Sequence, residues 1–321
     1  MRLPLLLQDP RPFVKGLLTW VPGLQGALYD RGSGGSSGSA AYCYGVWLKH
    51  LTLLWQHGMA VLPATVLELG PGASLGTGMA ALLSGAERHV AIDVTPLAPA
   101  DTNSRVLQDL VGLFRSRAAR PARSWPDYDA YLDERLFPGH ILTEERLGHS
   151  LAEARLATLA DAVKGLEAGA PKPAIRYATW TDPEPLGEGE ADLILSHSVL
   201  QHVTDLERVY AHCRRWLKPG GFMSHQIDFS AHGVTQAWNG HRQYGQRLWT
   251  VVAGRRPYFL NRQPCSDHLA LLRDCGFEVV ALMRNSRSDG IGRGRLAPMW
   301  RHLSDEDLST SGALIQARRR P

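Results

Sequence analysis

The sequence has few cysteines, no long hydrophobic run and little net charge. The four cysteines are Cys43, Cys213, Cys265 and Cys275. None of them has Cys-x-x-Cys spacing, which argues against a disulfide framework or a zinc site and favours reduced thiols in a cytoplasmic protein. The apolar run at residues 3–7 is too short for a signal peptide or a membrane span. At most, apolar residues within 13–21 predict a weak contact with a membrane surface.

The charge and composition are those of an ordinary globular protein. A formal net charge of +4 over 321 residues gives no strong reason to expect a nucleic-acid partner, although arginines cluster near residues 115–123 and 318–320. We interpret these clusters as solvated surface. Hydrophobic content of 44% is sufficient for a sizeable core. No internal repeat is visible, and composition alone does not indicate the oligomeric state.

One stretch combines a short apolar run, a glycine turn and an alanine-rich segment. Residues 65–69 predict a buried strand, the Gly-Pro-Gly sequence at 70–72 predicts a turn, and residues 77–84 predict a helix. A second apolar run ends at Asp93, 21 positions after Gly72. A carboxylate at about this distance commonly binds ribose hydroxyls, so the pattern predicts a site for a nucleotide-like ligand.

The glycine turn lacks the spacing of a dinucleotide fingerprint. That motif is G-x-G-x-x-G, whereas Gly70, Gly72 and Gly76 give one residue more before the third glycine. Glu68 also precedes the turn, and a carboxylate there repels phosphate but suits an ammonium or sulfonium charge. An NAD(P)-dependent oxidoreductase is therefore a distant alternative.

The rest of the chain alternates between predicted strands and helices. Further strands are expected at 89–93, 174–178, 191–196, 221–229, 277–283 and 312–317, and further helices at 42–55, 106–114, 151–166, 205–216 and 266–275. Such alternation predicts an α/β fold with a Rossmann-like sheet flanked by helices. We expect an N-terminal arm with a flexible Gly/Ser loop at 1–40, and one domain at 41–321. Within that domain we expect a helical insertion at 97–172 and an aromatic segment on the acceptor side at 230–265.

Four stretches of this domain resemble the motifs of class I S-adenosylmethionine-dependent methyltransferases. These are the Glu-Leu-Gly-Pro-Gly run at 68–72, Asp93 after the second strand, the run at 191–196, and the helix at 209–216 with its Leu-Lys-Pro-Gly-Gly turn at 217–221. The resemblance covers roughly residues 40–320 outside the insertion. It implies a seven-stranded methyltransferase sheet, S-adenosylmethionine as the cofactor and S-adenosylhomocysteine as the product.

The resemblance also implies which residues bind the cofactor. The candidates are Tyr42, Glu68, Gly70, Gly72, Ser74, Asp93, Trp180, Ser196 and His197. By analogy, the two glycines approach the methionine and ribose parts with backbone, and Asp93 binds the ribose hydroxyls. Trp180 stands where the family has an acidic residue that contacts adenine. An indole there predicts packing against adenine, with core packing as the equal alternative.

Methyl transfer to a hydroxyl needs a base, and histidine is suited to this near neutral pH. His202, His225 and His232 follow the fourth and fifth predicted strands. We predict His202 or His225 as the base, with Asp228 orienting a histidine or binding the acceptor. His225, Asp228 and His232 also permit a divalent metal as an alternative, but their spacing matches no specific motif, so no metal is expected.

The acceptor is predicted less directly. Residues 238–262 are rich in aromatics, amides and arginines, which suit a polar, cyclic acceptor, with loop packing as the alternative. The layout loosely resembles methyltransferases of bacterial surface-polysaccharide synthesis. We therefore predict O-methylation of a sugar or glycan hydroxyl, with a small-molecule amine, carbon or phenol as alternatives. A non-catalytic partner protein is disfavoured by Gly70, Gly72 and Asp93, and Ser-His-Ser-Val at 196–199 is not the signature for methylating base amines.

Overall fold

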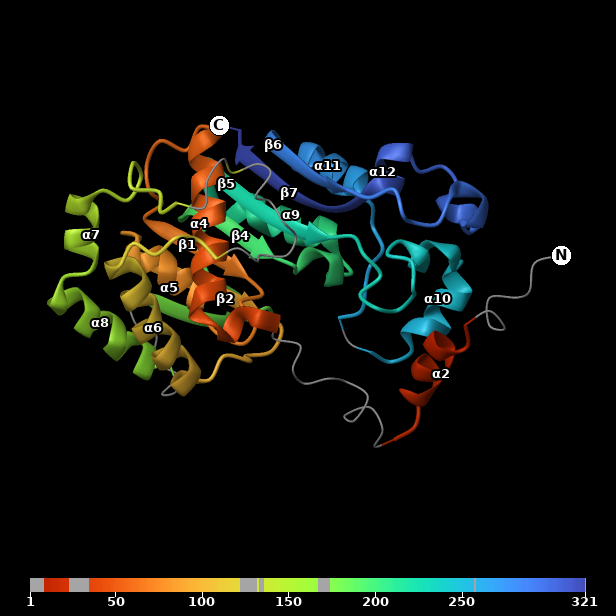
Figure 1. The fold of residues 1–321 in the computed structure, drawn as a ribbon, viewed down its shortest axis with the longest axis horizontal. Coiled ribbons are helices and arrows are strands. Elements are labelled where there is room, and N and C mark those ends of the chain that lie inside the picture. Colours follow the sequence, from red (N-terminus) through yellow and green to blue (C-terminus); the bar gives the residue numbers. More distant parts are fainter. Residues whose placement is uncertain are drawn as a thin grey trace.

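In the part of the protein that the structure describes, seven strands form a single sheet (Figure 1). The computed structural model describes residues 9–22, 35–121, 132, 136–166, 174–256 and 258–320. The strands are β1 (Thr65–Leu69), β2 (Arg88–Asp93), β3 (Ile175–Thr179), β4 (Ala191–His197), β5 (Leu217–Asp228), β6 (Phe277–Ser286) and β7 (Thr310–Arg319). All seven were predicted from the sequence. The largest boundary difference is at β5, which begins at the Leu-Lys-Pro-Gly-Gly run instead of after it.

The strand order is β3-β2-β1-β4-β5-β7-β6, and the first five of these strands are parallel. β7 is antiparallel to both β5 and β6. In the centre of the sheet, Leu69 of β1 lies opposite Ile92 of β2 and Ser196 of β4. The parallel strands therefore end along one edge, where ligands of open α/β sheets usually bind. The Rossmann-like seven-stranded fold predicted from the sequence is confirmed.

Helices cover both faces of the sheet, which explains why β1 is an apolar run without alternation. One face packs against α4 (Ala40–Gln56), α5 (Gly76–Leu83), α6 (Ala100–Arg115), α7 (Glu144–Ser150) and α8 (Glu153–Lys164). The other face packs against α9 (Leu206–Trp216) and α11 (Cys265–Asp274). Val66 belongs to the first core and Leu67 to the second.

The chain between β2 and β3 contains the helices α6, α7 and α8. The helices expected at 106–114 and 151–166 are therefore present, and α7 is additional. Much of the proline- and aromatic-rich piece at 120–128 lies outside the described residues. α6 contacts α4, α5 and α8, so this part of the chain extends the helical layer of the first face.

A helix from the N-terminal arm packs against a helix that follows β5. α2 (Arg11–Leu18) lies beside α10 (Gln246–Ala253), apart from the helices that cover the sheet (Figure 1). The ring of Phe13 meets the ring of Tyr244 edge to face, with centroids 5.6 Å apart. At the far end of α2, the backbone N–H of Arg255 donates to the Thr19 hydroxyl oxygen at 2.8 Å. Residues 1–8 and 23–34 lie outside the described part of the chain.

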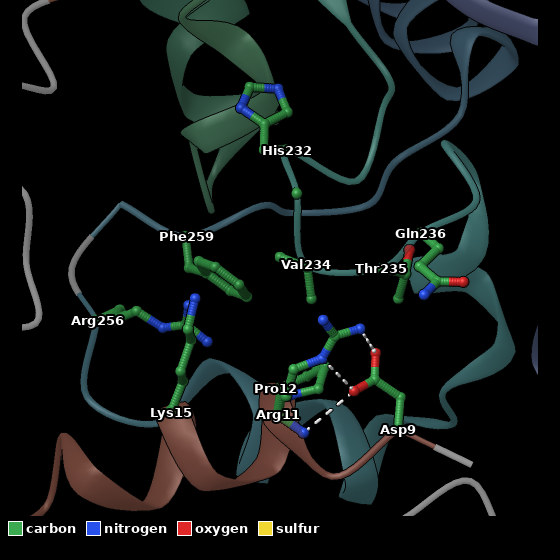
Figure 2. A pocket seen from close by; sticks show the side chains of 11 residues that line it. Asp9, Arg11, Pro12, Lys15, His232, Val234, Thr235, Gln236, Arg256 and Phe259 are labelled. Atoms are coloured by element: carbon green, nitrogen blue, oxygen red, sulfur yellow. Dashed lines mark hydrogen bonds and ion pairs between the residues drawn. The ribbon is translucent and has the colours of Figure 1, made fainter.

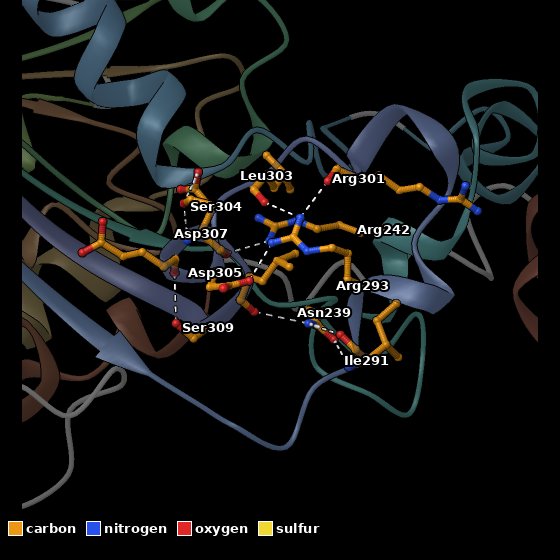
Figure 3. Close-up of polar contacts among 12 residues, drawn as sticks. Asn239, Arg242, Ile291, Arg293, Arg301, Leu303, Ser304, Asp305, Asp307 and Ser309 are labelled. Atoms are coloured by element: carbon orange, nitrogen blue, oxygen red, sulfur yellow. Dashed lines mark hydrogen bonds and ion pairs between the residues drawn. The ribbon is translucent and has the colours of Figure 1, made fainter.

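Polar contacts attach η4 (Gly240–Gln243) to the segment that leads into β7 (Figure 3). Arg242 donates to the carbonyl oxygen of Asp307 at 2.9 Å. The side-chain oxygen of Asn239 accepts the backbone N–H of Ile291 at 2.6 Å. Burial lowers the pKa of Arg242 to about 10. This arginine therefore stabilises the fold instead of presenting its charge to a ligand.

The packing of α5 on β2 depends on the absence of a side chain at Gly78. A Cβ atom there would lie 2.0 Å from two ring atoms of the buried His89. We predict that Gly78→Ala lowers the free energy of unfolding by about 1–3 kcal/mol through overpacking, measured by chemical denaturation. Gly112→Ala is the control, because this exposed position in α6 has open space around it, and we expect a gain of about 0.5–1 kcal/mol there. Equal stabilities of Gly78→Ala and the wild type would contradict the prediction.

Candidate active site

The turn after β1 has a backbone that only glycine accommodates without strain. Gly70 and Gly72 have φ angles of +64° and +75°, in the left-handed region. A Cβ atom on Gly70 would also lie 2.6 Å from a methyl group of Val199, which follows β4. The N–H of Gly70 donates to the carbonyl oxygen of Ile92 at 2.8 Å, which fixes the turn to β2. A ligand at this edge therefore meets backbone at close range.

Asp93 lies at the end of β2 beside this turn. Its carboxylate accepts the backbone N–H of Val94 at 2.7 Å and that of Gly72 at 3.5 Å. Burial raises the pKa of Asp93, and these backbone hydrogen bonds partly offset the rise. The side chain is only partly buried. The carboxylate is thus held over the glycine turn with part of its surface open to a ligand.

Glu68 places a buried carboxylate below the same turn. Its Oε2 atom lies 3.3 Å from Nε2 of His89 and has no hydrogen-bond partner among the described residues. Burial is the main cause that raises the pKa of Tyr42 to about 12, and smaller contributions come from Cys43 and then from the charge of Glu68. A buried carboxylate oxygen without a hydrogen bond favours a cationic ligand. The residues therefore fit the sulfonium or ammonium group of S-adenosylmethionine.

The Gly/Ser stretch of the arm ends in η1 (Gly35–Gly38), which sits on the glycine turn. The Ser37 hydroxyl oxygen accepts the backbone N–H of Ala73 at 2.8 Å. The carbonyl oxygen of Ser37 accepts hydrogen bonds from the hydroxyl of Ser74 and from the thiol of Cys43. Ser74 is buried, and its hydroxyl binds η1. This contact differs from the cofactor contact that the resemblance implies for Ser74. The sequence did not single out Ser37, because the Gly/Ser run predicts only a flexible loop.

His197, at the end of β4, belongs to a chain of polar side chains. Its Nδ1 atom lies 3.3 Å from Nε2 of His50 on α4, and the other ring nitrogen of His50 lies 2.7 Å from the Ser224 hydroxyl. The Tyr42 ring meets the His197 ring edge to face at 5.9 Å. Burial is the main cause that lowers the pKa of His50, so this ring is neutral. His50 could not be singled out from the sequence, because a single histidine in an apolar helix is ordinary.

Ser196 and His225 point to the opposite face of the sheet. The Ser196 hydroxyl lies 2.8 Å from Nδ1 of His225. The His225 ring packs 6.1 Å from the ring of Tyr210 on α9 and is 1% exposed. Burial lowers its pKa to about 3. An acceptor cannot reach this imidazole, so the expectation that His225 is the base conflicts with its position. The reason is strand alternation, which turns every second residue of β5 away from the α4 side.

Asp228 and His232 form a close pair after the end of β5. Their Oδ2 and Nε2 atoms are 3.0 Å apart, and the other Asp228 oxygen accepts the N–H of Ser230 at 2.8 Å. Desolvation opposes the charge of Asp228, but the contacts with His232 and Ser230 outweigh it and lower its pKa. His232 has a φ of +46°, a costly conformation for a non-glycine residue. The site therefore holds a histidine oriented by a carboxylate.

His202 lies beside this pair, in η3 (Leu200–His202). Its ring centroid is 5.2 Å from that of His232. Burial, and then the charge of His232, lowers the pKa of His202 to about 4. His202 is thus neutral at pH 7 but a weak base.

The structure brings His202, His232 and Asp228 together. His225 lies on the other side of the sheet and therefore does not join them as a metal ligand. Within the described ranges, no group of three or more His, Cys, Asp or Glu residues could hold a metal ion.

Trp180 directly follows β3 and is close to Asp93. Its backbone N–H donates to the carbonyl oxygen of Asp93 at 2.9 Å. Its ring meets the rings of His212 and Trp216 of α9 edge to face. The ring is partly exposed. The indole thus contributes to packing against α9 and still has surface open to a ligand.

Most of the aromatic segment predicted to bind an acceptor packs internally. Trp238, Tyr244 and Trp249 are buried. Arg262 lies 4.5 Å from the Trp249 ring and donates to the Tyr244 carbonyl oxygen at 2.7 Å. Burial, with the charge of a neighbouring arginine, lowers its pKa to about 10. Loop packing, the alternative interpretation of these residues, describes them better than acceptor binding does.

Asn261 of the same segment has a clear structural role. Its side-chain amide donates to the carbonyl oxygens of Leu200 and Val203, each at 2.7 Å. Its backbone N–H donates to the carbonyl oxygen of Gln201 at 2.8 Å. These three bonds fasten η3, so Asn261 positions the turn that carries His202.

Comparison with known proteins matches residues 150–224 to the family described as a methyltransferase domain. The ubiquinone biosynthesis O-methyltransferase of Paramagnetospirillum magneticum is 27% identical over 199 residues, which are 54% of this chain and 72% of that protein. The S-adenosylmethionine-dependent methyltransferase of Mesorhizobium loti has a TM-score of 0.42 at 14% identity, covering 84% of this chain and 96% of that one. The phosphoethanolamine N-methyltransferase 2 of Haemonchus contortus, solved with S-adenosyl-L-methionine, has a TM-score of 0.42 at 13% identity, covering 86% and 53%.

The strand order, the glycine turn after β1 and the family match together define the class of the protein. The chain is an S-adenosylmethionine-dependent methyltransferase, and S-adenosylmethionine is its cofactor. The matched residues contain β3, β4, α9 and the first part of β5. The described helices include none that is both long and apolar enough to cross a membrane.

The burial of His225 predicts a loss of stability in acid. Its folded pKa is about 3, whereas the unfolded value is about 6.5. Below pH 6.5 the unfolded chain therefore binds a proton that the folded chain does not, so the free energy of unfolding falls as the pH falls, until the pH approaches 3. Between pH 6 and 5, we expect His225→Gln to reduce this slope by about 1.4 kcal/mol per pH unit, measured by urea denaturation.

A control separates this effect from simple destabilisation. Ile227→Val shortens a buried side chain of the same strand without removing a titratable group. It should lower stability by about 0.5–1.5 kcal/mol at every pH and leave the slope unchanged. If His225→Gln kept the wild-type slope, His225 would not be the source of the acid sensitivity.

Proposed function

We propose that the enzyme transfers a methyl group to a hydroxyl oxygen and that His232, oriented by Asp228, takes the proton. The observation that carries this proposal is the 3.0 Å contact between the two side chains beyond the carboxyl end of β5. Because β1, β2, β4 and β5 are parallel, the carboxyl end of β5 lies at the same edge of the sheet as the glycine turn and Asp93. A base near the cofactor edge is what a neutral hydroxyl acceptor requires.

The cofactor residues that we propose follow from the edge geometry. Gly70 and Gly72 give backbone access, and the half-open carboxylate of Asp93 binds the ribose hydroxyls. Glu68 supplies a buried negative charge beneath the positively charged part of the cofactor. S-adenosylmethionine, when bound, supplies the methyl group from its sulfonium. Tyr42 and His197 line the α4 side of this edge in the proposal, and Trp180 lies on the Asp93 side.

The base has a defined proton path. When Nε2–H of His232 donates to Asp228, Nδ1 carries the lone pair and accepts the proton of the acceptor hydroxyl. Asp228 then stabilises the imidazolium through the same short contact. His202 is the other candidate from the sequence, but its pKa of about 4 makes it a poor proton acceptor at pH 7. We assign His202 to the wall of the site.

For the acceptor, we propose a compound with a hydroxyl group. The name of the Paramagnetospirillum relative supports oxygen as the atom that is methylated. A sugar or glycan hydroxyl remains our prediction, although the internal packing of Trp238, Tyr244 and Trp249 removes the stacking faces that first suggested it. A phenol is the second candidate, because it ionises more easily than an alcohol and depends less on the base.

Replacement of Asp93 tests the cofactor site. We predict that Asp93→Ala weakens S-adenosylhomocysteine binding by more than about 1 kcal/mol through lost hydrogen bonds to the ribose, measured by isothermal titration calorimetry. Asp109→Ala on the exposed side of α6 is the charge-matched control and should bind as the wild type does. Absence of S-adenosylhomocysteine binding by the wild type, or binding of NAD(P) in its place, would show that the cofactor site is wrong.

Replacement of His232 tests the base. We predict that His232→Asn lowers kcat about 10²–10⁴-fold for an alcohol acceptor, because the proton acceptor is lost. The affinity for S-adenosylhomocysteine should not change. Turnover is measured by transfer of labelled methyl from S-adenosylmethionine, and mass spectrometry identifies the methylated atom. The exposed His302→Asn is the control. Full turnover of His232→Asn would instead favour a phenol, amine or carbon acceptor that needs no such base.

A further inference from the structure

A cavity of about 280 Å³ lies between the N-terminal helix α2 and the loop that begins at His232 (Figure 2). Its lining residues are Asp9, Arg11, Pro12, Lys15, His232, Gly233, Val234, Thr235, Gln236, Arg256 and Phe259. One wall thus comes from residues 9–15 of the arm. The other wall comes from residues 232–236, which follow β5, and from residues 256 and 259, which follow α10. The cavity therefore reaches the proposed catalytic histidine.

Positive charge dominates the floor of this cavity. Arg11 is paired with Asp9 through a 2.9 Å contact, so its charge is compensated. Lys15 and Arg256 reach toward each other from different elements beside Phe259 (Figure 2). Neither forms an ion pair with a carboxylate among the described residues. Two like charges that point into the same space repel each other unless an anion lies between them.

The contacts of Arg256 leave part of its guanidinium for a ligand. Its Nε atom donates to the carbonyl oxygen of Ala253 at 3.1 Å, and Nη2 donates to that of Val252. The guanidinium carbon lies 4.0 Å from the centre of the Phe259 ring. All these partners are uncharged, and burial lowers the pKa of Arg256. The side chain is thus fixed and partly desolvated, and none of its partners among the described residues compensates its charge.

From this geometry we propose that the cavity binds an anionic group of the methyl acceptor, a phosphate or a carboxylate, through Lys15 and Arg256. The proposal rests on the proposed function, since it places the acceptor hydroxyl beside His232 on the opposite wall. The remaining terminal nitrogen of the Arg256 guanidinium and the nearby Lys15 ammonium are favourable charged donors for such oxygens. The substrate class would then be a small hydroxyl compound or sugar that carries an acidic group.

The arm is a structural part of this anion site. Gly16 follows Lys15 and lets α2 approach α10 closely, since a Cβ atom there would lie 2.0 Å from the carbonyl oxygen of Val251. Thr19 continues the contact by accepting the N–H of Arg255, the neighbour of Arg256. The position of Lys15 relative to Arg256 therefore depends on this close packing of the two helices.

Titration with inorganic phosphate and with acetate tests the site. Both anions are added to the S-adenosylhomocysteine-bound enzyme at constant ionic strength, with chloride as the balancing ion, and binding is followed by calorimetry and NMR. We expect Lys15→Gln/Arg256→Gln to weaken phosphate binding at least about tenfold relative to the wild type. Lys164→Gln/Arg247→Gln removes the same charge at exposed positions outside the cavity and should change nothing.

Two further measurements keep the test independent of folding and of the cofactor. The affinity for S-adenosylhomocysteine should be unchanged in the double variant, which shows that the fold is intact. Gly16→Ala should also weaken phosphate binding, because α2 must move away from α10. The anion that binds more tightly, phosphate or acetate, identifies the acidic group of the acceptor as a phosphate or a carboxylate.

Two results would overturn the anion site. One is the absence of binding of either anion by the wild type up to about tens of millimolar, the range in which a single weak site is detectable. The other is equal binding by the wild type and the double variant, which would leave Arg256 as a cap of α10 and Lys15 as an ordinary surface lysine. Absence of S-adenosylhomocysteine binding by the wild type would instead refute the proposed function, and the same anion titration of the enzyme without S-adenosylhomocysteine would then test the anion site by itself.

Discussion

The parallel pairing of β1 with β2 and β4 is the constraint on which the site depends. It brings the glycine turn, Asp93 and His197 to one edge, although these residues are far apart in the sequence. The turn itself fits only because Gly70 and Gly72 adopt positive φ angles and lack side chains. In the proposed cofactor site, the buried carboxylate of Glu68 lies below this turn. A carboxylate there opposes a pyrophosphate and favours a cation, which supports S-adenosylmethionine over a dinucleotide.

Much of the fold could be predicted from the sequence because both faces of the sheet are covered. Buried parallel strands read as short apolar runs, and β1 and β4 are clear examples. Within the candidate site, the position of a residue was predictable where it depends on that residue's own backbone or on the end of a strand, as for Gly70, Gly72 and Asp93. His225 was misplaced because the two sides of β5 differ by a single residue: Ser224 contacts His50 on α4, while His225 packs against Tyr210 on α9.

Other features depend on contacts between distant segments, which composition does not reveal. The Gly/Ser run has the composition of a linker, yet Ser37 forms two hydrogen bonds with the turn after β1 and accepts a third from Cys43 of α4. The aromatic segment has the composition of a sugar-binding surface, yet Arg262 and Trp249 stabilise each other in the interior. In both cases the residue types permit two uses, and only the packing decides between them.

The acceptor side of the enzyme is built differently from the cofactor side. The cofactor edge consists of strand ends and a turn whose conformations are fixed by the sheet. The cavity beside His232 is formed instead by the N-terminal arm with α2, by the loop after β5 and by the residues that follow α10. α2 and α10 contact each other through Gly16 and Thr19, which sets the distance between these walls. In the proposed site, the sheet holds the methyl donor and the arm supplies a charge that the sheet does not provide. Because such peripheral elements can change without disturbing the strands, the proposal assigns acceptor specificity to the arm and to the loop from β5 to α10.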